Sequence, residues 1–206
     1  MCGLLVVHAD PALLVVEKPA GLLCVPGRGE AGRDNLASRV QADYPDAFVV
    51  HRLDMATSGL MLFARGLDMH RRLSAAFAAR QIAKGYVAVV EGCLGADAGE
   101  IDAPLAADWP QRPRQKVDAA LGKPALTRWR VLERGTDWTR LALEPVTGRS
   151  HQLRVHLQSI GHPIRGDALY APPPLRDLRL LLHATHLAFK HPAHDGGVEF
   201  TSRAPF

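Results

Sequence analysis

Cysteine is scarce in this sequence, and its spacing excludes several kinds of site. The 206 residues contain only three cysteines, Cys2, Cys24 and Cys93, and no two of them form a Cys-x-x-Cys pair. An odd number of isolated cysteines builds neither a disulfide framework nor a cysteine-rich zinc site. Free thiols are typical of a reducing compartment, so we expect a cytoplasmic protein.

Long apolar runs are also missing. The apolar start, Leu4 to Val7, is interrupted by His8, Asp10 and Pro11. No later stretch approaches the roughly 20 apolar residues that cross a bilayer. No small-residue cleavage site follows a basic start. The sequence therefore predicts neither a signal peptide nor a membrane anchor, and no membrane partner.

The chain has no repeat, low-complexity tract or charge block, and its 15 prolines and 18 glycines are spread along its whole length. No linker is marked by such a pattern. With 47% hydrophobic residues the chain can bury a real core. We expect a single domain over residues 1–206.

Lysine is rare beside arginine. Twenty arginines and five lysines contribute to a formal net charge of +4. The planar guanidinium suits phosphate, which makes nucleic acid a plausible partner. A GC-rich coding bias explains the same composition equally well, so charge alone does not decide function.

Apolar periodicity predicts both strands and helices. Short apolar runs flanked by turn residues predict strands at Leu13–Val16, Phe48–Val50, Leu60–Ala64 and Tyr86–Val90, and a hairpin over 127–133 and 139–144. Helical spacing predicts one helix over about 67 to 80 and another that Ser150 caps and Gly161 ends. Strands outnumber helices and do not alternate regularly with them, so the fold class is α+β with a largely antiparallel or mixed sheet.

The segment from His51 to Gly59 carries the best candidate for chemistry. It places Arg52 and Asp54 two residues apart, in a polar connection between two predicted strands. Loops on rigid strands commonly carry active sites. Taken alone, Asp54 is also explained as the residue that caps the Thr57-Ser58-Gly59 turn.

Two longer motifs favour a catalytic role for Asp54 over a role in the turn alone. His51-Arg52-Leu53-Asp54 with Thr57-Ser58-Gly59, and Gly148-Arg149-Ser150-His151-Gln152-Leu153-Arg154-Val155-His156, resemble the two signatures of RluA-type pseudouridine synthases. Lys84-Gly85-Tyr86 resembles that family's intervening strand, and Val16-Glu17-Lys18-Pro19 resembles its opening strand and turn. The segments around Trp109 and Lys123 resemble the RluA branch more closely still. The similarity covers nearly the whole chain.

The resemblance implies an isomerase that converts uridine to pseudouridine in RNA loops, in ribosomal RNA, transfer RNA or both. It implies the pseudouridine synthase fold, with an active-site cleft across the sheet, and no cofactor. By the same resemblance Asp54 is the nucleophile, Tyr86 packs on the target base and can move a proton, and Arg154 pairs with Asp54. Such a pair would hold the Asp54 carboxylate ionised at neutral pH. Residue types leave open whether Asp54 attacks C1′ of the ribose, attacks C6 of the uracil, or deprotonates the sugar.

Other residues are expected to bind RNA or to support the site. Arg52 would hold the flipped nucleotide, His51 and His183 would support the catalytic loop, and candidates for phosphate contacts include Arg149, Arg112 and Lys116. A metal site is not expected, because a helix places His151 and His156 about 140° apart. Taken singly, Tyr86 is better explained as an edge or core tyrosine of a strand, and Arg154 as a solvated helix arginine.

Two alternatives remain open at this point. One is a non-catalytic RNA-binding protein of the same fold. The other is a glycoside or nucleoside hydrolase, although no second carboxylate accompanies Asp54 in either signature. The resemblance to the catalytic domain starts near the first residues, so we expect no S4-type RNA-binding domain in front. The enzyme is expected to act as a monomer.

Overall fold

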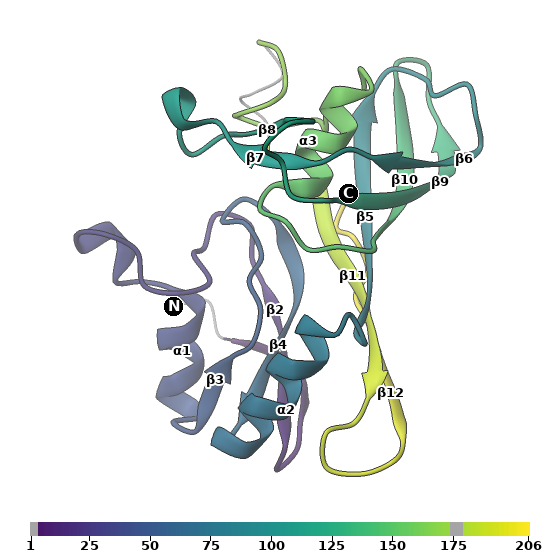
Figure 1. Ribbon diagram of the computed structural model, residues 1–206. Helices are drawn as coiled ribbons and strands as arrows, with labels where there is room; N and C mark the ends of the chain where they lie inside the picture. The colour runs from purple at the N-terminus through teal and green to yellow at the C-terminus, as the bar shows by residue number, and fades with distance from the viewer. Residues whose placement is uncertain (1–3, 174–178) are drawn as a thin grey trace. The chain divides into compact units, whose positions relative to one another are not determined.

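The computed structural model describes residues 4–173 and 179–206, so Cys2 lies outside the described residues. The chain groups into two compact units. The first unit comprises Met1–Ala83 with Ala184–Pro205, and the second comprises Lys84–His183 with Phe206 (Figure 1). The expected single-domain organisation is not tested by this grouping and stays a prediction.

Strands β1 (Leu5–Ala9), β2 (Leu13–Lys18), β4 (Ser58–Arg65) and β11 (Leu182–Lys190) form the sheet of the first unit, in that order. Strand β3 (Ala47–Val49) pairs with β4, and β12 (Gly197–Thr201) pairs with β11. The β1–β2, β2–β4, β3–β4 and β11–β12 pairs are antiparallel. A short 3-10 helix, η1 (Glu30–Gly32), precedes helix α1 (Leu36–Asp43), and helix α2 (Leu67–Ala78) follows β4.

Strands β2 and β4 are buried on both faces, which explains their uninterrupted apolar runs. Leu13 and Val15 of β2 and Leu60 and Leu62 of β4 share one core cluster. Helix α2 covers this cluster with Leu73, assisted at its margin by the partly buried Met69, Ala76 and Phe77. The helical face predicted from the sequence is therefore the face that packs.

Strands β5 (Ala83–Glu91), β10 (Trp138–Pro145), β9 (Leu126–Arg134) and β6 (Ala98–Asp102) form consecutive antiparallel pairs in the second unit. A separate two-stranded sheet, β7 (Leu105–Ala107) with β8 (Gln115–Val117), carries the 3-10 helix η2 (Trp109–Gln111) in its connection. Helix α3 (Gln152–Ser159) follows β10. These strands and helices confirm the α+β class, the predicted strands and the hairpin.

Two helix boundaries differ from the prediction. Helix α2 ends at Ala78, because Arg80 adopts a left-handed conformation with φ 58° and cannot extend the helix. Helix α3 begins at Gln152, and its N-cap is His151, with φ 54°, so the expected Ser150 cap is wrong. Neither position carries the glycine or the capping side chain that a sequence pattern detects. Within the described residues, no helix is both long and apolar enough to cross a membrane.

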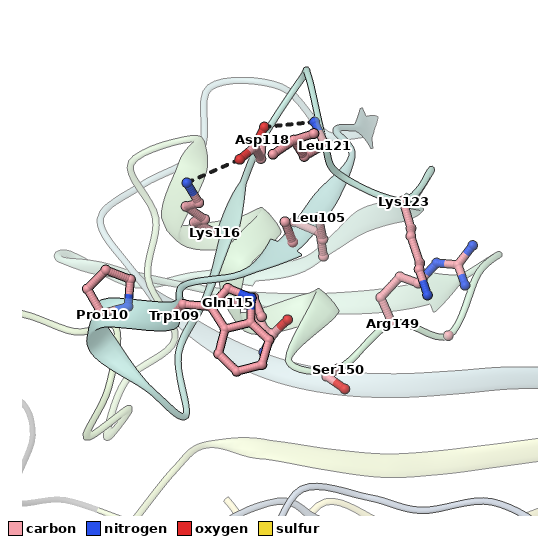
Figure 2. Close-up of a pocket in the computed structure, with 13 residues that line it drawn as sticks. Leu105, Trp109, Pro110, Gln115, Lys116, Asp118, Leu121, Lys123, Arg149 and Ser150 are labelled. Atoms are coloured by element: carbon pink, nitrogen blue, oxygen red, sulfur yellow. Dashed lines mark hydrogen bonds and ion pairs between the residues drawn. The ribbon is translucent and has the colours of Figure 1, made fainter.

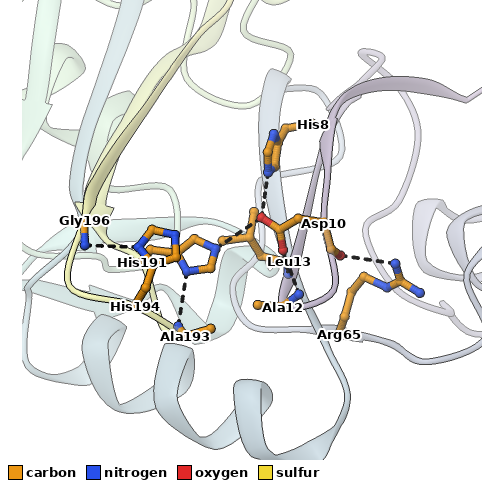
Figure 3. Close-up of polar contacts among 9 residues, drawn as sticks. All are labelled: His8, Asp10, Ala12, Leu13, Arg65, His191, Ala193, His194 and Gly196. Carbon is orange, nitrogen blue, oxygen red and sulfur yellow. Dashed lines mark hydrogen bonds and ion pairs between the residues drawn. The ribbon is translucent and has the colours of Figure 1, made fainter.

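Asp10 makes several polar contacts within the first unit (Figure 3). Its carboxylate accepts hydrogen bonds from the backbone amides of Ala12 and Leu13, at 2.7 and 2.9 Å, which shape the β1–β2 turn. The same carboxylate contacts the imidazoles of His8, at 2.7 Å, and His191, at 3.1 Å. Asp10 therefore joins the β1–β2 turn to the residue that follows β11.

Stability should depend on the ionised form of Asp10. Burial acts to raise the pKa of Asp10, but the hydrogen bonds from His8, Ala12, Leu13 and His191 outweigh it and hold this pKa well below its usual range. A depressed carboxyl pKa stabilises the fold above the unfolded-state value of about 4 and loses that effect as pH falls below it. We expect Asp10→Asn to cost about 1–2 kcal/mol at neutral pH.

Urea denaturation of both proteins between pH 3 and pH 7 measures this effect. The difference in unfolding free energy should be constant above about pH 5 and shrink toward pH 3. A difference that stays unchanged down to pH 3 would show that the charge of Asp10 has no role.

Candidate active site

Asp54 lies in the connection between β3 and β4, as the sequence predicts. The backbone amide of Thr57 donates to the carbonyl of Asp54 at 3.1 Å, which closes the turn. Thr57 and Ser58 are buried, whereas Asp54 is partly exposed. The far end of the turn is thus anchored in the core of the first unit, whereas Asp54 keeps part of its surface exposed.

Lys18 stabilises this turn through hydrogen bonds to backbone carbonyls. Its side chain is fully buried, and its ammonium group donates to the carbonyls of Pro19, Leu22 and Met55 at 2.9, 2.7 and 2.9 Å. Burial lowers the pKa of Lys18 to about 8, while Cys24 and Asp54 act in the opposite direction. The amine remains mostly protonated at pH 7, so all three of its hydrogens have acceptors.

Cys24 makes a second tie to the same loop. Its buried thiol donates to the carbonyl of Leu53 at 3.1 Å and accepts from the amide of Leu53 at 3.3 Å. Burial raises the pKa of the Cys24 thiol, which keeps it protonated and able to donate. Leu53 and Met55, the two neighbours of Asp54, are therefore both fixed through their backbones.

Replacing Lys18 should loosen the Asp54 turn. Lys18→Met keeps the length of the side chain but removes the ammonium group that donates to three carbonyls, and we expect unfolding to become easier by about 2–3 kcal/mol. Turnover should fall about tenfold, since small displacements of a catalytic group are costly. Thermal melting and single-turnover kinetics measure the two effects, and Lys190→Met, at an exposed lysine paired with Asp195, is the matched control. Equal behaviour of the two variants would contradict the role of Lys18.

His51 and Arg52 differ in how they are placed. The amide of Leu62 donates to Nε2 of His51 at 2.9 Å, and the His51 ring stacks on Phe77 with centroids 4.6 Å apart. His51 thus supports β4 and α2, as expected for a residue behind the loop. Arg52 is exposed. A role of either residue in binding RNA stays a prediction.

The second motif forms the start of α3 in the second unit. Gln152 is buried, and its amide oxygen accepts from the hydroxyl of Thr147 at 2.7 Å and the backbone amide of Arg149 at 3.0 Å. Its amide nitrogen donates to the carbonyl of Leu126 and the hydroxyl of Thr127, both at 3.0 Å. One glutamine therefore fixes the α3 entry to β9 and to the end of β10.

Arg154 is buried, with 5% of its side chain exposed, so its interpretation as a solvated helix arginine is wrong. Its Nε and one terminal nitrogen donate to the two carboxylate oxygens of Asp167, at 2.7 and 2.8 Å. Asp167 also accepts from the backbone amides of Leu169 and Tyr170. The bidentate pair fixes the guanidinium plane. Sequence analysis did not identify Asp167, because a pair separated by 13 residues leaves no local pattern.

Tyr170 connects this pair to the rest of the unit. Its ring lies under the Arg154 guanidinium, 5.1 Å from ring centroid to Cζ. Its hydroxyl accepts from the amide of Gln115 at 2.7 Å and lies 2.8 Å from Nδ1 of His151. Burial raises the pKa of Tyr170, although the Gln115 amide acts against it. The raised pKa keeps the Tyr170 hydroxyl protonated at neutral pH.

Tyr86 stands on β5, opposite Leu143 of β10. It is partly exposed, whereas Ala88 and Val90, which share its face by strand alternation, are buried. Tyr86 and Arg154 belong to the second unit and Asp54 to the first. The joint action of these three residues stays a prediction.

Two histidines of the second unit, His156 and His183, are buried. His156 is buried and contacts the hydroxyl of Thr127 and the carbonyl of Ala103, both at 2.9 Å. His183 is also buried, and burial together with the charge of Arg179 lowers the pKa of His183 to about 4, so it is neutral at pH 7. Among residues 4–173 and 179–206, no group of three or more His, Cys, Asp or Glu side chains is arranged to hold a metal ion.

The second unit also contains a cavity of about 640 Å³, which we name the Trp109 pocket (Figure 2). Its lining includes Trp109, Gln115, Lys116, Lys123, Arg149 and Ser150. The Arg112 guanidinium lies 3.8 Å from the centroid of the Trp109 ring. Lys116 and Arg149, two of the cations predicted to contact phosphate, therefore line one cavity together with Lys123, and Arg112 lies against the ring of Trp109.

Comparisons with known proteins all find similarity to pseudouridine synthases. Residues 12–159 match the family model described as RNA pseudouridylate synthase. The chain is 48% identical over 206 residues to the dual-specificity RNA pseudouridine synthase RluA of Escherichia coli (strain K12), covering 98% of this chain and 94% of that protein. The enzyme of the same name from Yersinia pestis is 47% identical, with 98% and 100% covered. Among solved structures, human RNA pseudouridylate synthase domain containing 1 is similar with a TM-score of 0.83, 28% identity, and 99% and 84% of the two chains covered.

Proposed function

Because the chain belongs to the RNA pseudouridylate synthase family, we propose that it isomerises uridines in both ribosomal and transfer RNA, with Asp54 as the nucleophile. Conversion of uridine to pseudouridine in RNA is the activity of this family and of this enzyme. The dual substrate range rests on one observation, the 48% identity over nearly the whole chain to relatives named as dual-specificity enzymes.

The reaction breaks the bond between N1 of uracil and C1′ of ribose and forms a bond between C5 and C1′. The hydrogen at C5 leaves as a proton, and N1 gains a proton, so the RNA keeps its mass. The reaction needs one well-placed nucleophile that holds an intermediate. A carboxylate on a turn that is fixed at both neighbouring residues meets this need. No electron transfer enters the balance.

We propose that Arg154 and Tyr86 assist Asp54. The bidentate contact with Asp167 holds the Arg154 guanidinium in one orientation. A cation that supports an ionised carboxylate needs such a fixed orientation. Tyr86 is partly exposed, and we propose that its ring packs on the target uracil once the uracil has left the RNA stack, at a cost of a few kcal/mol. Arg52, exposed beside Asp54, is suited to hold the flipped nucleotide.

The enzyme is proposed to work as a monomer in the cytoplasm. Cys24 and Cys93 are free thiols, which suits a reducing compartment. Sedimentation at micromolar concentration tests the monomer, with a single species near the 22.4 kDa chain mass expected.

Nucleoside analysis of two unmodified transcripts tests the substrate range. Ribosomal RNA and transfer RNA are incubated separately with the enzyme, digested and separated by chromatography with mass detection. We expect pseudouridine, of unchanged mass and altered retention, in both. Pseudouridine in only one transcript would overturn the dual range, and release of free uracil would indicate a hydrolase instead.

A further inference from the structure

The Trp109 pocket has features that folding does not require. The Trp109 side chain is a large apolar group, yet the residue is 65% exposed, and Leu121 on the same lining is 82% exposed. Exposed apolar groups that lie together and are rimmed by polar residues commonly mark a binding site. Arg112 orients the indole by lying 3.8 Å from its centroid.

The charge around the pocket is predominantly positive. Lys116, Lys123 and Arg149 line it together with a single carboxylate, Asp118 (Figure 2). Asp118 is already engaged, because it pairs with Lys116 at 3.1 Å and accepts from the amides of Ala120 and Leu121. The lining therefore offers excess positive charge to an anionic ligand.

The frame of the pocket is fixed by backbone contacts. Leu105 and Lys123 exchange two backbone hydrogen bonds, at 3.0 and 2.8 Å. Gly122 donates to the carbonyl of Asp118 at 2.9 Å, and a Cβ at Gly122 would lie only 2.3 Å from that oxygen. Lys123 is thus held on a tight turn that only glycine permits. A largely preformed hollow in the range of about 300–1,000 Å³ is typical of sites for small ligand groups.

The pocket is also connected to Arg154. The amide of Gln115, a lining residue, donates to the hydroxyl of Tyr170, which contacts His151 and lies beneath Arg154. Each of these residues belongs to the second unit. The lining of the pocket is therefore linked to Arg154 through Gln115 and Tyr170.

We propose that the Trp109 pocket binds one nucleotide of the substrate RNA other than the target uridine, an assignment that rests on the proposed action on RNA. The base stacks on the indole of Trp109, and Lys123 and Arg149 contact its phosphate. Stacking on an aromatic ring tolerates any base, whereas the cations require a phosphate backbone. The pocket therefore selects a nucleotide exposed from a loop rather than a particular sequence.

Binding of a fluorescein-labelled transfer RNA stem-loop, measured by anisotropy, tests this assignment without turnover. All variants are made in an Asp54→Asn background. We expect Trp109→Leu to weaken binding about tenfold and Trp109→Phe, which keeps a ring, to weaken it by less than about threefold. Lys123→Gln should reduce the slope of log affinity against log salt concentration by about one. Lys190→Gln, at an exposed lysine of the first unit, should leave affinity and slope unchanged.

The comparison between leucine and phenylalanine separates lost stacking from lost folding, which circular dichroism checks independently. Unchanged affinity of a folded Trp109→Leu protein would overturn the proposal. Tight binding of free AMP to the protein, together with unchanged RNA affinity of the pocket variants, would also overturn the proposal. Because only binding is measured, failure of this assignment is distinct from failure of the proposed reaction, which shows as lost turnover in the enzyme with Asp54 intact.

Discussion

Asp54→Asn should form no detectable pseudouridine while folding normally. Asparagine has nearly the same shape as aspartate but no nucleophilic carboxylate, so any mechanism that uses Asp54 as the nucleophile or as the base is blocked. The turn itself should persist, because it is closed by the Asp54 backbone carbonyl and held through the backbones of Leu53 and Met55. We expect turnover to fall by at least about four orders of magnitude, as for loss of a covalent catalyst.

Single-turnover incubation with a stem-loop substrate, followed by nucleoside chromatography, measures this loss. Asp46→Asn is the matched control, since Asp46 is partly exposed, pairs with Arg65 and precedes β3. The control should keep its turnover, and both variants should show the circular dichroism of the parent. Turnover by a well-folded Asp54→Asn enzyme would exclude Asp54 as the nucleophile.

Asp167→Asn should destabilise the protein more than any change at its surface. The Arg154–Asp167 pair has side-chain exposures of 5% and 0%, so the substitution removes the charge that Asp167 places against a buried guanidinium. Breaking a buried pair in this way costs about 3–5 kcal/mol. For a chain of this size the melting temperature should fall by roughly 10 °C. Arg154→Lys keeps the charge but not the two parallel bonds, so we expect impaired turnover and a smaller loss of stability.

Thermal and urea denaturation measure these effects. The control is Asp97→Asn, which removes the charge from a carboxylate that is 90% exposed and paired with Arg134 at 2.7 Å. Exposed pairs contribute about 0–1 kcal/mol, so this variant should melt close to the parent. If Asp167→Asn loses no more stability than Asp97→Asn, the buried pair does not hold α3 in place.

Sequence patterns were sufficient for the elements with strong periodicity. The apolar runs of β2 and β4 are buried on both faces, and the helical face of α2 contacts the core as its spacing predicts. The ends of the helices were not predictable. Arg80 and His151 adopt left-handed conformations although neither is glycine, and no local pattern indicates such positions.

The candidate site was likewise predicted only in part. Asp54, Tyr86 and Arg154 were identified because two contiguous motifs and one strand resemble a known family. The supporting roles of other residues were not predicted, because each contact spans a long interval of chain. Lys18 reaches the carbonyl of Met55 across 37 residues, and Gln115 reaches Tyr170 across 55. Such contacts depend on tertiary packing, which a single sequence does not display.

Release of tritium from RNA labelled at C5 of uridine tests the central claim most directly, because that hydrogen must leave when C5 becomes the glycosidic carbon. Unmodified ribosomal and transfer RNA transcripts are each incubated with the enzyme, and released tritium is compared with pseudouridine formed. We predict release in a one-to-one ratio with pseudouridine from both transcripts. No release by a folded enzyme, or appearance of free uracil, would contradict the account.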